Sequence, residues 1–174
     1  IKKRVKLERL TKSVIESKRQ DLTTRTTCII GFPHETWSDI FATILFQLKM
    51  AFRGIDDLPL YIFSPYPGTE IFDELMEGGR IMLNDDYFFK LTSLNGDYFA
   101  TDIPVFNDNI NGRLLGVVRL VAVLTNYTIS YLLYPKRIIR SIRNIVSGND
   151  ASTVFEHRLK DFFKRKKEAP TTIT

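Results

Sequence analysis

The chain has 174 residues, of which 44% are hydrophobic and 26% are charged. This composition excludes a disordered polypeptide, which has too little apolar surface to fold, and a multi-span membrane protein, which carries fewer charges. The length predicts one domain, or one domain and part of another, built around a core.

The single cysteine, Cys28, excludes an internal disulfide, a zinc site made only of cysteines and a self-contained iron–sulfur cluster, because each needs several thiolates. The chain begins at Ile1 without a hydrophobic signal segment. We therefore expect a fragment whose remainder lies upstream.

Charge is distributed unevenly along the chain. Residues 1–30, 31–112 and 113–174 carry net charges of +6, −9 and +8. The layout predicts at least two functional zones, and the basic end could meet an anionic surface. For the basic run Lys164–Lys167 a solvated face is the favoured explanation.

The first 80 residues predict a helix and then a strand–helix–strand unit. Apolar residues recur three or four apart from Val5 to Arg19, which is the pattern of an amphipathic helix. Thr23–Ile30 and Leu58–Ser64 are typical of buried parallel strands, and the periodic stretch Ser38–Arg53 predicts a helix between them. In such a βαβ unit, ligands bind at the carboxyl ends of the strands.

Two helices are predicted beyond residue 112. Leu114–Tyr134 is almost entirely apolar, with its polar residues on one narrow stripe, and Lys136–Val146 is amphipathic and basic. The first is long enough to cross a bilayer, but Arg119 and Asn126 would be costly there. The pair packs under the open side of a partial barrel, lies in a membrane interface where lipid phosphates meet Arg137, Arg140 and Arg143, or does both in turn. Of these, we expect interfacial association of the full-length protein.

Two strand-end segments carry a family resemblance. They read Gly31-Phe32-Pro33-His34-Glu35-Thr36 and Ser64-Pro65-Tyr66-Pro67-Gly68-Thr69, the second followed by the acidic stretch Glu70–Gly79. In this order and spacing they resemble the fifth and sixth strand ends of radical S-adenosylmethionine enzymes. The likeness is greatest to members with a cobalamin-binding domain before the barrel, in which a basic helix with tyrosine and proline also tends to follow. His34 departs from the pattern, which more often has glycine there.

The resemblance implies an α/β fold. Residues 1–80 would form the C-terminal portion of a partial (β/α) barrel of the TIM type with parallel strands. Residues 81–112 would be an irregular region with short elements on the substrate side, and residues 113–174 a mainly helical, basic extension.

The resemblance also implies a cofactor site at the strand ends. Adenine would lie against apolar surface and exposed backbone there, and the candidate contacts are Ile29, Gly31, Phe32, Pro33, Glu35, Ser64, Pro65 and Tyr66. For Glu35 two roles stay open: contact with the ligand, or holding the loop by accepting backbone N–H bonds. No residue is assigned as catalytic or as a metal ligand.

The family's cofactors are S-adenosylmethionine and a [4Fe–4S] cluster, which a Cys-x-x-x-Cys-x-x-Cys loop holds. That loop is absent from this sequence. We therefore expect these cofactors in the full-length protein, and neither a cofactor nor activity in this chain alone. Use of cobalamin, as in methyltransferases and cyclases of the subgroup, stays open.

Three functions are consistent with the sequence. The first is the C-terminal part of a radical S-adenosylmethionine enzyme, in the cytoplasm, acting on a small-molecule or lipid-like substrate. The second is a binding module of the membrane surface that uses helices 113–146 on anionic lipid. The third, a nucleic-acid-binding domain, is not expected, because the middle of the chain is acidic and no reader motif occurs.

Overall fold

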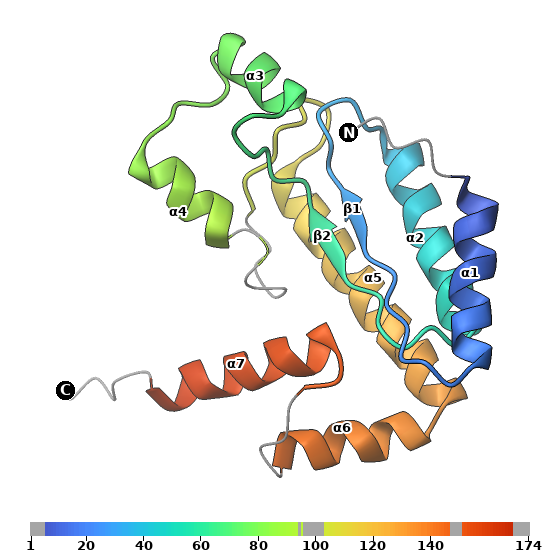
Figure 1. Ribbon diagram of the computed structural model, residues 1–174. Helices are drawn as coiled ribbons and strands as arrows, with labels where there is room; N and C mark the ends of the chain where they lie inside the picture. The colour runs from blue at the N-terminus through green and yellow to red at the C-terminus, as the bar shows by residue number, and fades with distance from the viewer. Residues whose placement is uncertain (1–5, 94, 96–102, 147–150, 169–174) are drawn as a thin grey trace.

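The computed structural model describes residues 6–93, 95, 103–146 and 151–168. Within these ranges the chain forms seven helices and one small parallel sheet (Figure 1). In chain order the elements are α1 (Leu7–Arg19), β1 (Cys28–Ile30), α2 (Trp37–Phe52), β2 (Leu60–Ile62), α3 (Glu70–Glu77), α4 (Asp85–Ser93), α5 (Gly112–Leu133), α6 (Lys136–Val146) and α7 (Val154–Glu168).

The two strands pair in parallel, with Ile29 opposite Tyr61, which confirms the βαβ unit. Both are shorter than predicted. Pro59 has no N–H to donate, so the ladder is regular only from Leu60 onward, and before it a single bridge joins Arg25 to Asp57. The described residues thus make a mostly helical α/β structure with two strands, and they form no barrel.

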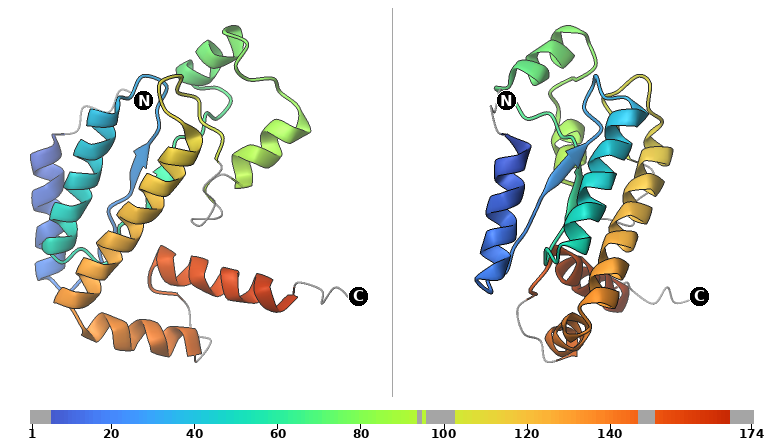
Figure 2. Two further views of the ribbon diagram at one scale, coloured as in Figure 1. Left: turned by 180° about the vertical axis from the view of Figure 1, so that it is seen from behind. Right: turned by 90° about the vertical axis from the view of Figure 1, so that its right-hand side faces the viewer.

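α2 and α5 lie side by side over one face of the sheet (Figures 1 and 2). α2 begins at a capping box, in which Thr36 accepts from the backbone N–H of Asp39 while the Asp39 carboxylate accepts from that of Thr36. The main core lies between these helices and the sheet and includes Ile30, Ile40, Leu60, Ile62, Leu115 and Val123. The opposite face of the sheet has no such cover from α2 or α5.

The polar stripe of α5 faces inward. Arg119, Asn126 and Ser130 are buried, and the Asn126 amide donates to the Gln47 side chain of α2 at 3.1 Å. Apolar residues lie on the outer side, where Val121 and Leu132 are exposed. α5 is long and apolar enough to cross a membrane by length and composition, but nearly half of that stretch packs within the chain.

α6 is inverted relative to an ordinary amphipathic surface helix, which buries its apolar face and exposes its polar face. Its apolar face is exposed, with Ile139 at 70% and Val146 at 79% of full accessibility, while Arg137, Ser141 and Asn144 are buried. The expectation that Arg137 faces lipid together with Arg140 and Arg143 is therefore wrong for Arg137. Its guanidinium lies 3.0 Å from Asp56 and donates to the carbonyl of Gly54 at the end of α2.

The described residues between 81 and 111 form one short helix, α4, among loops, and α7 (Val154–Glu168) lies in the stretch that was predicted to be mainly helical. The start of α7 is well anchored. The rings of Phe155 and Tyr127 stack with centroids 4.6 Å apart, and the N–H of Val154 donates to Asp57 at 3.1 Å. Glu156 accepts from Ser141 and Asn144 of α6.

Two adjacent aspartates, Asp56 and Asp57, hold the base of the sheet. Asp56 accepts from the N–H of Thr24 and from Lys18 of α1, each at 3.1 Å, and pairs with Arg137. Burial alone would raise the pKa of Asp56, but these hydrogen bonds and cations outweigh it and leave the pKa below its ordinary value.

We predict that Asp56→Asn lowers the free energy of unfolding by about 3–5 kcal/mol at pH 7, because it leaves the buried Arg137 cation unpaired. Since folding lowers the pKa of Asp56, its contribution is present above the unfolded-state pKa of about 3.9 and is lost as the pH falls through the folded value. Urea unfolding at several pH values measures both effects. The exposed Asp73→Asn on α3 is the control, and equal losses in the two variants would contradict the prediction.

Candidate functional site

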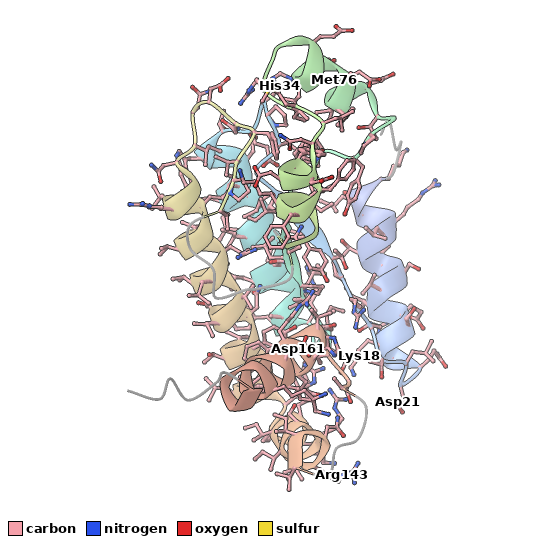
Figure 3. The ribbon with its side chains drawn as sticks, turned by 90° about the vertical axis from the view of Figure 1, so that its left-hand side faces the viewer. Lys18, Asp21, His34, Met76, Arg143 and Asp161 are labelled. Carbon is pink, nitrogen blue, oxygen red and sulfur yellow. The ribbon has the colours of Figure 1, made fainter. Side chains whose placement is uncertain are left out.

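The two motif segments meet at the carboxyl edge of the sheet. The Phe63 N–H, just past β2, donates to the carbonyl of Ile30 at 2.8 Å, and the rings of Phe32 and Phe63 lie 4.5 Å apart. His34 lies at this end of the molecule, as does Met76 of α3, while Arg143 of α6 lies at the far end (Figure 3). The predicted juxtaposition of the two segments is confirmed.

Glu35 holds the first segment from within. One oxygen of its carboxylate accepts from the N–H of Gly31 at 2.6 Å and from that of Phe32 at 3.2 Å. Burial raises the pKa of Glu35, and the two N–H bonds only partly offset this. The structure therefore shows Glu35 in the second of its two predicted roles, in which it holds the loop by accepting backbone N–H bonds.

Gly31 is required for packing. Its φ is +86°, a conformation that side chains rarely adopt, and a Cβ there would approach Leu115 to 2.9 Å. Gly31 is buried and its N–H is already used by Glu35. Leu115 of α5 thus fills the space beside Gly31. The expectation that adenine approaches Gly31 closely does not agree with this arrangement.

Two residues that the sequence analysis did not select also fix these loops. The Asn107 amide donates to the carbonyls of Phe32 and Glu35, both at 2.7 Å, and the Tyr87 hydroxyl of α4 donates to the carbonyl of Pro65. Burial raises the pKa of Tyr87, so it keeps its proton for this bond. Neither residue has a local sequence signal, because each acts on a loop far away in the chain.

A cleft of about 1100 Å³ lies beside the motif segments. Four of the eight predicted residues line it: Ile29, Phe32, Ser64 and Tyr66. The other four do not: Pro33 and Pro65 are buried like Gly31, and Glu35 is turned toward the backbone. Phe63, Leu91 and Tyr61 add further apolar and aromatic wall.

Asn95 closes the outer edge of β2. Its side-chain amide accepts from the N–H of Ile62 and donates to the carbonyl of Ile62, both at 2.9 Å, as a neighbouring strand would. Its backbone carbonyl accepts from Arg158 of α7 at 3.0 Å, and both residues line the cleft. Sequence reasoning missed these two residues as well.

The lining suits the adenine of S-adenosylmethionine in part. Ile29 is 44% exposed at the cleft, which offers apolar surface for a planar base, and the hydroxyls of Ser64 and Tyr66 add polar groups. The iron–sulfur cluster does not fit. Burial raises the pKa of the Cys28 thiol to about 11, and no group of three His, Cys, Asp or Glu able to hold a metal occurs among the described residues.

Comparisons with protein-family models, curated proteins and solved structures found no match to this chain.

We predict that Glu35→Ala lowers the free energy of unfolding by about 1–3 kcal/mol, because the partly buried N–H groups of Gly31 and Phe32 lose their acceptor. Glu35→Gln should stay close to wild type, since a single carbonyl oxygen can accept both bonds. Urea unfolding followed by far-UV circular dichroism compares the two variants. A Gln variant as unstable as the Ala variant would show that the carboxylate acts through its charge.

Proposed function

We propose that this chain is the C-terminal part of the barrel of a radical S-adenosylmethionine enzyme, supplying adenine-side and substrate-side contacts. The observation that carries the proposal is the cleft on the face of the parallel strand pair that α2 and α5 leave open, bounded by both strand-end segments. In (β/α) barrels the helices cover the outer face of the strands and the site lies at their carboxyl ends.

Two further features support the proposal. Ile30 and Ile62 point into the helix-covered core, while Ile29 and Tyr61 face the cleft, which matches the outside and inside of a barrel wall. The edge of β2 away from β1 is closed by Asn95, as the last strand of a partial barrel requires, whereas β1 has no second strand partner among the described residues.

In the proposed enzyme this chain binds and orients. Ile29 supplies the apolar face for the adenine, Ser64 and Tyr66 offer hydroxyls near it, and Glu35 and Asn107 hold the loop that shapes the site. The cluster, with its cleavage of S-adenosylmethionine, would be held by cysteines outside this chain.

The proposal is tested on the protein encoded by the extended reading frame. We expect a Cys-x-x-x-Cys-x-x-Cys loop upstream of Ile1 and, after anaerobic reconstitution with iron and sulfide, reductive cleavage of S-adenosylmethionine. Ile29→Asp should raise KM for S-adenosylmethionine about tenfold or more, because it places a carboxylate against the adenine. Leu45→Asp, at an exposed apolar position on α2, is the matched control.

Three results would contradict the proposal. They are an upstream sequence without the three cysteines, a KM unchanged by Ile29→Asp, and a stoichiometric four-iron cluster formed by the 174-residue chain alone, which has one cysteine.

A specific observation also favours a second function, attachment to an anionic membrane surface. The outer face of α6 exposes Ile138, Ile139, Ile142 and Val146, and Leu132 and Leu133 at the end of α5 are exposed too. Lys136 and Arg143 are exposed on the same helix, and residues 113–174 carry a net charge of +8. Apolar residues flanked by cations are the pattern of an interfacial helix.

We predict that the chain floats with vesicles containing phosphatidylserine more than with neutral phosphatidylcholine vesicles, and less as salt rises. Ile139→Asp/Ile142→Asp should lose this binding, whereas Leu45→Asp should keep it. Arg137 is left unchanged because it is part of the buried ion pair. Equal flotation with both vesicle types, or no loss in the double variant, would show that α6 packs against protein.

A further inference from the structure

One cation lies in the wall of the cleft. Arg158 of α7 lines the cleft with a side chain that is 24% exposed, and most of the other lining residues are apolar or aromatic. Among the described residues that line the cleft, it is the only cation, and Glu70 is the only acid. A partly buried cation in apolar surroundings is costly unless an anion meets it.

The guanidinium has spare donors. It donates to the carbonyl of Asn95 at 3.0 Å, and the carboxylate of Asp161 on the next turn lies 3.9 Å away, too far for a strong pair. Its Nε is buried, and no described residue accepts a hydrogen bond from it, so the donors left for a ligand are the remaining N–H groups of Nη1 and Nη2. A guanidinium has five N–H donors in a planar fork that matches carboxylate and phosphate oxygens.

The position of Arg158 is set by the rest of the fold. Phe155, one turn earlier on α7, stacks on Tyr127, and Glu156 is hydrogen-bonded to α6. The first turn of α7 is therefore locked against the core. The guanidinium that follows it is placed beside Asn95 at the edge of β2.

We propose that the cleft binds a ligand with an apolar body and an anionic oxygen group, a carboxylate or a phosphate, held by Arg158. The apolar walls take the body, and the remaining N–H groups of the Arg158 guanidinium, which lines the cleft, donate to the anionic oxygens. This inference deepens the proposed function and rests on it, because it names the class of substrate for the same cleft.

The test compares probes that differ only in the charged group. Binding of 2-naphthoate, 2-naphthyl phosphate and the neutral 2-naphthamide to the 174-residue chain is measured by calorimetry. We expect at least one of the two anions to bind about tenfold more tightly than the amide or better, and their order identifies the carboxylate or the phosphate as the natural group. Arg158→Gln should remove the preference while leaving binding of 2-naphthamide unchanged.

Two further variants keep the test decisive. Lys49→Gln removes an exposed cation of α2 outside the cleft and should change nothing. Ile29→Asp, which adds a carboxylate to the cleft wall at an exposed position, should weaken the anions more than the amide even if Arg158→Gln fails to fold. Binding of no probe, equal binding of anions and amide, or a preference that survives Arg158→Gln overturns the inference.

The experiments distinguish a failure of this inference from a failure of the proposed function. A preference for anions in a protein whose extended form does not cleave S-adenosylmethionine would retain the anion site and remove the radical reaction. Cleavage without any anion preference would retain the enzyme and remove the anion site.

Discussion

The buried carboxylates of Asp56 and Asp57 are the interaction on which the arrangement of the elements depends. Asp56 contacts α1 through Lys18 and α6 through Arg137, and Asp57 accepts from Arg25, from the Tyr127 hydroxyl of α5 and from the first turn of α7. Five segments far apart in sequence are thereby joined at the base of β2. Removing one partner leaves an uncompensated buried charge. These contacts therefore determine which elements pack together, and they also contribute to the free energy of unfolding.

Ion pairs and hydrogen bonds to buried carboxylates thus hold the base of the sheet. Hydrogen bonds to the two strand-end loops fix the other end, where the strands have their carboxyl ends. Glu35 and Asn107 satisfy the backbone groups of the first loop, and Tyr87 holds the second. Neither loop relies on the cleft for its shape. A preformed wall of this kind allows a ligand to bind without first ordering the loops, which lowers the entropic cost of binding.

The βαβ unit could be predicted from the sequence because its signals are local. The capping box of Thr36 and Asp39, the periodic apolar residues of α2 and the proline-glycine turn after β2 each act within a few residues. The parallel pairing and the meeting of the two strand ends follow from these signals. The lengths of the strands did not, because Pro59, inside the predicted second strand, has no N–H for the ladder and the N–H of Thr24 in the first is taken by the Asp56 carboxylate.

The site was less predictable because its decisive contacts are long-range. Asn95 and Arg158 are 63 residues apart, and each is an ordinary polar residue in its own neighbourhood. Gly31 was assigned to a ligand because glycine leaves space, but only the position of Leu115 on α5 reveals that this space is filled.

The inversion of α6 follows from the same buried charges. Arg137 must lie inward to meet Asp56 and the carbonyls of Gly54 and Ile55, and on a helix the residues three and four positions along share its face. Ser141 and Asn144 are therefore also turned inward, where Glu156 meets them, and the isoleucines between them are turned out. Because the polar face of α6 packs against the core, its apolar face is the one exposed at the surface. Figure 3 places this face, marked by Arg143, at the end of the molecule away from His34 and the strand-end loops. A surface that covered the exposed face of α6 would therefore leave the strand-end loops uncovered.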